Sequence, residues 1–221
     1  MKHIVVDLEM NPIGFGEEAR AFGTNEVIEI GAVMLDENLT EIASFRTYVK
    51  PQFNTGIVKK ITKLTGITDE MVANAPYFNT AFRMFTSWCL GTGEDFVIHA
   101  WSRSDYLQIV SETEMKKYEA DESEALVLDK EWDDFQHMFD KQMGFERQLS
   151  LKTALDMAGI DFEGRAHDAL DDARNTAELL HVFCDEELFN KTLKKIEEVM
   201  KPTSIDCALG SLFDFAALMG A

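Results

Sequence analysis

The order of the strand-like segments along the chain is the feature that most restricts its fold. Three such segments stand near the N-terminus and are rich in apolar residues: Ile4–Leu8, Val27–Leu35 and Glu41–Val49. Two later segments, Glu94–Ala100 and Ala125–Leu128, are predicted strands that are each followed by a helix. Hairpin strands followed by strand–helix alternation predict an α/β fold with a mixed sheet covered by helices on both faces.

Helical periodicity dominates the rest of the chain. The spacing of Phe78, Phe82 and Phe85 predicts a helix that ends at Gly91-Thr92-Gly93. Further helices are predicted at Asp105–Tyr118, Lys130–Met143, Leu149–Ala158, Ala169–Phe183 and Leu188–Met200. The segment from Asn11 to Glu26, with Pro12 and three glycines, is predicted to be a loop.

Length and composition favour one compact unit. The chain has 221 residues, of which 46% are hydrophobic, so it can bury a substantial core. The apolar tail Ser204–Ala221 is expected to cap this core, and the alternative is an interface with a protein partner.

The charge and the cysteines restrict the class of protein. A formal net charge of −19 argues against binding polyanions through a broad basic face, but screening over about 8 Å leaves room for a nucleic-acid enzyme with a local site. Three widely separated cysteines indicate neither a disulfide framework nor a zinc site. With no predicted secretory segment or membrane span, we expect a cytoplasmic protein.

Two carboxylates interrupt the first predicted strand, in the stretch V-V-D-L-E-M. Side chains at i and i+2 of a strand share one face, so Asp7 and Glu9 lie about 6.6 Å apart along it while Val6 and Leu8 point to the other face. Two buried like charges are costly unless a cation compensates them, and hard divalent ions prefer oxygen ligands. The alternative is a strand end at which both carboxylates meet water.

A second acidic site lies far along the chain, in G-R-A-H-D-A-L-D-D-A-R-N-T-A. At about 100° per residue, the buried stripe of the predicted helix is Ala169, Ala173, Thr176, Ala177 and Leu180. Asp172 flanks this stripe and faces inward, whereas Asp171 shares the solvent face with Arg174, Asn175 and Glu178. His167 precedes the helix and can approach Asp172. A histidine beside a metal cluster can take a proton from water, although a lone histidine such as His99 is more often structural.

Asp105 is the third acidic candidate. It fits a capping box with Ser102, which explains it structurally. It also follows the carboxyl end of a central strand, where open α/β sheets build their sites.

These residues, in this order, resemble the DEDDh family of 3′–5′ exonucleases, whose fold is ribonuclease-H-like. The resemblance matches Asp7-Leu8-Glu9 to the family's first element, Asp105 to its second, and His167 with Asp172 to its third. It implies a five-stranded sheet of three antiparallel strands followed by two parallel ones. The implied organisation is an exonuclease domain over residues 1–185, with residues 186–221 as a helical extension packed on it.

Within that family the chain is most similar to the Eri-like and KapD-like exonucleases. The similarity rests on Y-V-K-P, L-T-G-I-T, W-S-R-S-D and S-L-K-T-A-L, together with the histidine motif, and it runs from about Lys2 to Phe183. The V-D-L-E-M start is also similar to oligoribonuclease.

The resemblance implies a two-metal phosphodiesterase that uses Mg²⁺ or Mn²⁺. Asp7, Glu9 and Asp172 would hold one ion, Asp7 and Asp105 would serve the other, and His167 would be the general base. Such an enzyme would bind the 3′ ends of RNA or single-stranded DNA and release nucleoside 5′-monophosphates.

Four residues are candidates for binding the substrate. The resemblance assigns Met10, Leu64 and Thr65 to a pocket for the terminal nucleotide, and Trp101 is suited to stack on a base. Core packing is the alternative for Met10, Leu64 and Trp101. At the level of the whole protein, the alternatives are a regulatory binding protein of the same fold, like the KapD-like inhibitor, and an oligoribonuclease-like enzyme on very short RNAs.

Overall fold

A mixed sheet forms the centre of the protein, which we describe from a computed structural model over residues 1–130, 132–145 and 148–200. Within these residues, five strands pair in the order β3-β2-β1-β4-β5. Their bounds are β1 Lys2–Pro12, β2 Asn25–Leu35, β3 Glu41–Tyr48, β4 Phe96–Ala100 and β5 Asp133–Asp134. β1 to β3 are antiparallel neighbours, while β4 is parallel to β1 and β5 is parallel to β4. The predicted fold class is therefore confirmed.

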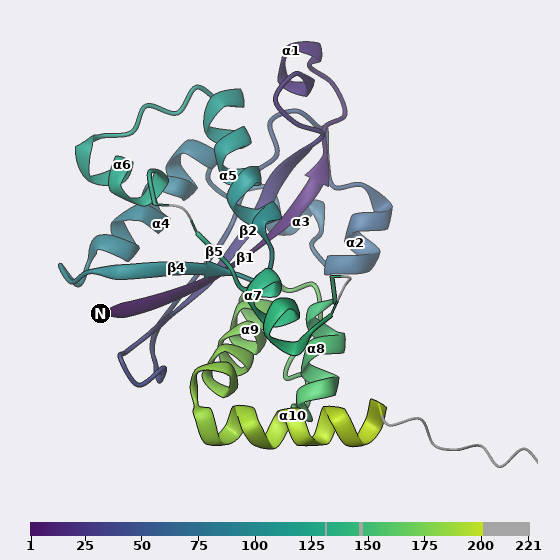
Figure 1. The fold of residues 1–221 in the computed structure, drawn as a ribbon. Helices are drawn as coiled ribbons and strands as arrows, with labels where there is room; N and C mark the ends of the chain where they lie inside the picture. The colour runs from purple at the N-terminus through teal and green to yellow at the C-terminus, as the bar shows by residue number, and fades with distance from the viewer. Residues whose placement is uncertain (131, 146–147, 201–221) are drawn as a thin grey trace, which may run out of the picture.

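Helices follow and flank the strands (Figure 1). They are α1 Glu17–Arg20, α2 Lys59–Thr65, α3 Asp69–Val72, α4 Phe78–Leu90, α5 Arg103–Met115, α6 Glu122–Leu128, α7 Phe135–Met143, α8 Leu151–Ala158, α9 Ala169–Cys184 and α10 Glu186–Met200. Figure 1 shows α4, α5 and α6 on one side of the sheet, with α7, α8 and α9 on the other.

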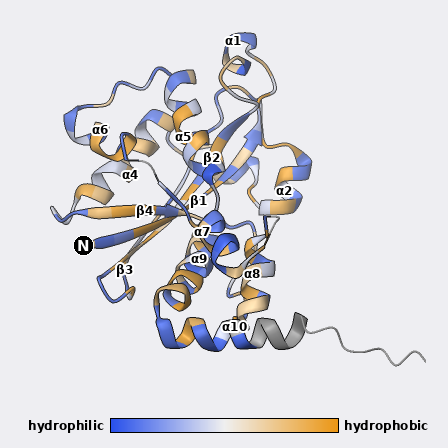
Figure 2. Cartoon of the chain, in the orientation of Figure 1, coloured by the Kyte–Doolittle hydropathy of each residue, from blue (hydrophilic) through white to orange (hydrophobic). Residues whose placement is uncertain are grey.

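Alternation along β1 divides the core between the two faces of the sheet. Ile4, Val6 and Leu8 pack with the buried aromatic side chains of α4, whereas Val5 belongs to a separate cluster with residues of α7, α8 and α9. The strands and the inner parts of the flanking helices carry much of the hydrophobic colour in Figure 2. Because β1 is covered on both faces, a polar side chain on it must find a partner or a cleft.

The predicted fifth strand is wrong in position. Ala125–Leu128 lies within α6, and the strand beside β4 is Asp133–Asp134, in a segment predicted to be helical. A capping box explains the difference: Asp121 accepts hydrogen bonds from the first turn of α6, and Glu124 accepts one from the backbone N–H of Asp121. These bonds start a helix at Glu122, whereas the short apolar run Ala125–Leu128 alone is typical of a strand.

β1 also extends beyond its predicted end at Leu8. It pairs with β2 as far as Pro12, with an irregular register between Glu9 and Met10. Asn11 stabilises this extension because its fully buried amide accepts a hydrogen bond from the Val58 N–H at 2.9 Å and donates one to the Gly56 carbonyl at 3.2 Å. The carboxylates therefore lie inside the strand, and the predicted loop is shorter.

The C-terminal helix packs against the rest of the structure. α10 contacts α8 and α9, and the rings of Phe183 and Phe189 lie 5.5 Å apart. The prediction of a helix at Leu188–Met200 is confirmed, with a start two residues earlier. The tail Ser204–Ala221 lies outside the described residues. Over the described part of the chain, none of the helices has the length and apolar character needed to span a membrane.

Candidate active site

All five predicted catalytic residues line one cleft of about 820 Å³. They come from three separate elements: Asp7 and Glu9 from β1, Asp105 from the first turn of α5, and His167 and Asp172 from the start of α9 and the residues before it. The volume lies within the range of ligand-binding clefts. The structure thus brings together every member of the predicted acidic set.

The alternating geometry of β1 aims both of its carboxylates at this cleft. Asp7 and Glu9 share the face that carries Val5, and Val6 and Leu8 pack on the opposite side. Met10 follows the register irregularity, packs against the cluster that holds Val6 and Leu8, and also lines the cleft.

Asp105 reaches the site from the carboxyl end of β4. Ser102 is the N-cap of α5 and accepts a hydrogen bond from the Ser104 N–H, which starts the helix directly after the strand. Asp105 then lies in the first turn, only 5% exposed, and a hydrogen bond joins it to the backbone of Leu8 on β1. Ser102 therefore caps the helix through the Ser104 N–H and not through the predicted capping box with Asp105, whose carboxylate lines the cleft.

α9 supplies Asp172 as its wheel pattern predicts. The predicted stripe Ala169, Ala173, Thr176, Ala177 and Leu180 is buried. Asn175, however, is buried as well, whereas the helical pattern predicts it on the solvent face. Its amide is satisfied there because it bonds both the N–H and the carbonyl of Glu163. Asp171 is half-buried and accepts a hydrogen bond from the Arg165 N–H at 2.8 Å.

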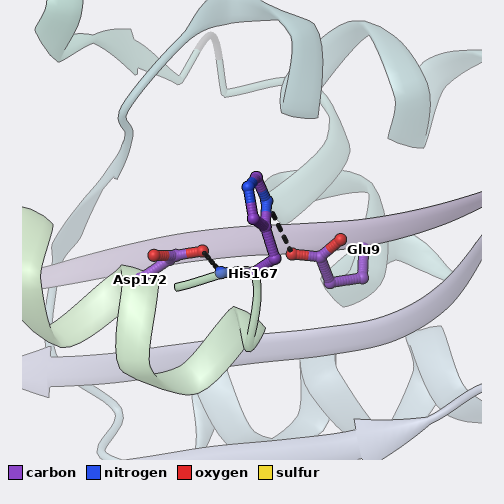
Figure 3. A group of neighbouring side chains, drawn as sticks. All are labelled: Glu9, His167 and Asp172. Atoms are coloured by element: carbon purple, nitrogen blue, oxygen red, sulfur yellow. Dashed lines mark hydrogen bonds and ion pairs between the residues drawn. The ribbon is translucent and has the colours of Figure 1, made fainter. Parts of the chain in front are cut away.

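His167 is held at the mouth of the cleft by its own backbone. Its φ of 64° lies in the left-handed region, and its N–H donates to Asp172 Oδ2 at 2.9 Å. Figure 3 shows this bond together with the ring, whose Nδ1 lies 3.9 Å from Glu9 Oε1. The side chain is 52% exposed. An imidazole so placed is open to water on one side and faces two carboxylates on the other.

Burial raises the pKa of every carboxylate in the cluster, and repulsion from neighbouring acids adds to the effect for Asp7, Glu9 and Asp172. Burial, followed by the charges of Asp105 and Asp172, raises the pKa of Asp7 well above its usual range. Burial and the charge of Asp172 raise the pKa of Glu9 to about 8. Burial raises the pKa of Asp105 to about 7 and that of Asp172 to about 6, against the opposing effect of their hydrogen bonds.

These carboxylates suit a divalent cation. One ligand atom each from Glu9, His167 and Asp172 lies within 4.8 Å of the others, and the buried acids need positive charge to ionise. Carboxylate oxygens are the ligands that hard ions such as Mg²⁺ and Mn²⁺ prefer. The donor set therefore fits the metal that the sequence implies.

The predicted substrate-binding residues divide into two pairs. Met10 and Trp101 line the cleft, and Trp101 is also packed against Phe135 and Phe139 of α7. Leu64 and Thr65 are on α2, outside the residues that line the cleft. Arg165 connects the two regions, since its Nη2 lies 3.4 Å from the Leu64 carbonyl.

Glu29 is an acidic residue beside the site that is not among the predicted site residues. It lies directly opposite Glu9 in the β1–β2 ladder, is fully buried, and forms an ion pair with Arg46. Its signal in the sequence is a carboxylate inside the apolar run V-I-E-I-G-A-V, which resembles the pattern around Asp7.

The sheet order and this acidic cleft define an α/β domain of ribonuclease-H-like architecture. A family model described as exonuclease, RNase_T, matches residues 4–180, and the chain belongs to this family. Members of the family generally use divalent metal ions.

Curated relatives are similar over part of their length. The 3′-5′ exoribonuclease 1 of Rattus norvegicus is 28% identical over 163 residues, which cover 70% of this chain and 46% of the relative. The ERI1 exoribonuclease 2 of Danio rerio is 32% identical over 171 residues, which cover 69% of this chain and 30% of the relative. The chain thus spans less than half the length of these relatives.

A solved structure supports the fold. The nuclease domain of 3′hExo, a DEDDh family member bound to rAMP, matches with a TM-score of 0.68 and 23% identity. The match covers 81% of this chain and 90% of that domain. This likeness extends the ribonuclease-H-like fold across most of the chain.

Proposed function

We propose that this protein is a metal-dependent 3′–5′ exonuclease that hydrolyses phosphodiester bonds of RNA or single-stranded DNA and releases nucleoside 5′-monophosphates. The observation that carries the proposal is the convergence of Asp7, Glu9, Asp105, Asp172 and His167 on one cleft in a member of the exonuclease family. A complete acidic set favours the enzyme over a regulatory binding protein, which would not need it.

Asp7, Glu9, Asp105 and Asp172 are the proposed ligands of two Mg²⁺ or Mn²⁺ ions. When bound, such ions supply activation of water and stabilisation of the negative charge that develops on the leaving oxygen. The protein contributes a rigid set of oxygens: β1 fixes two carboxylates on a central strand, and the N–H of His167 holds one oxygen of Asp172.

His167 is the proposed general base. Its imidazole is exposed at the mouth of the cleft, so it can accept a proton from water and pass it to solvent. Its backbone bond to Asp172 couples the position of this base to that of a metal ligand. The left-handed φ turns the chain between the two residues sharply enough for both to face the cleft.

The substrate is proposed to enter with its 3′-terminal nucleotide against Met10 and Trp101. Both residues line the cleft, which is large enough for a nucleotide. Leu64 and Thr65 are proposed to contact the same nucleotide from α2, which the Arg165–Leu64 contact joins to the residues before α9. The names of the curated relatives make RNA the first substrate to test.

Oligonucleotides with labelled 3′ ends test the function directly. The purified protein is incubated with RNA and DNA of several lengths, first with Mg²⁺ or Mn²⁺ and then with a chelator. We expect metal-dependent release of labelled mononucleotide, its loss in Asp7→Ala, and its retention in Glu41→Gln, which removes a carboxylate outside the cleft. If no substrate yields mononucleotide with either metal, the exonuclease proposal is wrong. Release from very short RNAs alone would favour the oligoribonuclease-like alternative.

We also propose that residues 1–185 are the exonuclease domain and that residues 186–221 are an extension packed on it. The contacts of α10 with α8 and α9 support this division, as does the end of the family match at residue 180. A protein partner for the apolar tail stays a prediction. A cytoplasmic location is proposed from the cysteines, because Cys89 and Cys184 are both free thiols.

A further inference from the structure

The register of β1, β2 and β3 arranges the residues beside the cleft in two rows. Residues that pair directly across a sheet project from the same face. The first row holds Asp7, Gly31 and Arg46, and the second holds Glu9, Glu29 and Tyr48. The two rows place a glycine and a buried acid next to the proposed metal ligands. Arg46 lies one strand further out.

Gly31 lets the start of α9 lie directly on the sheet. A Cβ at this position would lie 2.2 Å from the carbonyl carbon of Ala169 and 2.3 Å from the nitrogen of Leu170. No side chain fits in that space. Because Gly31 has none, the backbone at the start of α9 can lie against β2. Asp172 follows within one turn and shares a cleft with Asp7 of the same row.

Arg46 fastens the same end of α9 to the sheet. Its Nε donates to Glu29 Oε1 at 2.6 Å, and its Nη2 donates to Asp168 Oδ2 at 2.6 Å. Glu29 Oε2 in turn accepts a hydrogen bond from the Ala169 N–H at 3.3 Å. One planar guanidinium therefore joins β3, β2 and the N-cap of α9, in a fork that a lysine cannot reproduce.

The charge of Arg46 and its position have opposite effects on a cation in the cleft. A positive charge beside the carboxylates weakens cation binding by repulsion. A correctly placed α9 strengthens binding, because Asp172 then reaches the same site as Glu9. Removing the side chain therefore distinguishes the two roles. If repulsion by the charge dominates, the metal affinity rises, and if the positioning of α9 dominates, the metal affinity falls.

We propose that Arg46 is a positioning residue that, through its bonds to Glu29 and Asp168, sets the distance of Asp172 and His167 from the carboxylates of β1. The proposal rests on the proposed function for the identity of the bound ion. It assigns to Gly31 the complementary role of admitting the helix backbone.

Mn²⁺ titration by calorimetry tests the proposal without any turnover. We expect Arg46→Met to bind Mn²⁺ about 10- to 100-fold more weakly than the wild type, as is usual when an outer partner of a metal ligand is removed. The matched control is Arg174→Met, which breaks an ion pair between the same two elements, α9 and Glu41 of β3, further along the helix. Its Mn²⁺ affinity should stay within about threefold of the wild type.

Two more variants separate geometry from charge and from folding. Gly31→Ala leaves every charge in place and displaces α9, so it should also weaken Mn²⁺ binding. Arg46→Lys keeps the charge but not the fork, and it should retain less than half of the wild-type affinity. Circular dichroism checks that each variant is folded, and Arg46→Lys with Gly31→Ala carry the test if Arg46→Met does not fold.

An unchanged or tighter Mn²⁺ affinity in Arg46→Met, or a wild-type affinity in Arg46→Lys or Gly31→Ala, overturns the positioning role. In nuclease assays the same variants should lose kcat while the KM for the oligonucleotide changes less than about threefold, because Arg46 acts through the metal ligands. A wild-type protein that binds Mn²⁺ but releases no nucleotide would refute the proposed function alone. In that case the Mn²⁺ titrations of the Arg46 variants would still test the positioning role.

Discussion

Replacing Glu9 with glutamine should stabilise the metal-free protein at neutral pH while it damages the proposed metal site. Burial and the neighbouring acids raise the pKa of Glu9 from its ordinary 4.5 to about 8. The folded state therefore binds this proton more tightly than the unfolded chain does. Stability is highest below the unfolded pKa and is lost as the pH rises toward the folded one. Glutamine has the shape of the protonated acid and no such dependence.

The expected magnitude follows from the size of the pKa change. Each pKa unit corresponds to about 1.4 kcal/mol, and pH 7 lies about 2.5 units above the unfolded pKa, where the folded carboxyl still keeps most of its proton. The free energy of unfolding should therefore fall by about 3 kcal/mol between pH 4.5 and 7 through this residue alone. For a chain of this size, that difference moves the melting temperature by about 6–12 °C. The titratable groups that face Glu9 are Asp7, Asp172, Glu29, Asp105, Asp168 and His167.

Thermal melts with a chelator, at pH 5, 6, 7 and 8, measure the effect. Near pH 5 the wild type and Glu9→Gln should melt close together, and the variant should melt progressively higher as the pH rises. Saturating Mg²⁺ should raise the melting temperature of the wild type more than that of the variant, because it binds the ionised form. Melting curves of the two proteins that stay parallel from pH 5 to 8 would refute the reasoning about this buried carboxylate.

Three further predictions concern catalysis, linkage and folding. His167→Ala should lower kcat by about 10²–10⁴-fold with little change in Mn²⁺ affinity, and a wild-type rate in single-turnover assays would exclude it as the base. Mn²⁺ binding at pH 7 should release protons, because the raised pKa values of Glu9 and Asp105, about 8 and about 7, leave both partly protonated without metal. Calorimetry in buffers of different ionisation enthalpy measures this release, and the contribution of Glu9 and Asp105 to it should decline as the pH rises past 8. Asp121→Ala should cost about 1 kcal/mol in urea unfolding, since it removes the cap of α6, and an unchanged midpoint would contradict that role.

Local geometry is enough to predict the faces of individual elements. The period of two along β1 correctly places Asp7 and Glu9 together, and the period of the helix correctly chooses Asp172 as an inward acid. These patterns succeed because they depend only on the backbone geometry of one element. Their meeting at one cleft depends on topology, which the order of the strands indicates.

Features that depend on tertiary partners could not be predicted in the same way. β5 has only two residues, and the contact between His99 Nδ1 and Asp133 Oδ2 at 3.3 Å helps to hold it against β4. Asn175 is polar, yet it is buried because Glu163 offers it both a donor and an acceptor. Arg46 bonds to Glu29, which is 17 positions away in the sequence, and to Asp168, which is 122 positions away. Sequence patterns within one element do not indicate contacts over such separations.

The central position of β1 divides the cleft into two parts with different local stability. β1 pairs with β2 as far as Pro12 and with β4 from Lys2 to Val6, so exposing its amides requires opening the centre of the sheet. Asp105 and Asp172 lie in first turns of helices, which open with far less disruption. In amide hydrogen exchange, the half of the cleft on β1 should exchange only with global unfolding. The amides around Asp105 and Asp172 should exchange earlier. A bound ion should slow the exchange of these amides more than that of the β1 amides.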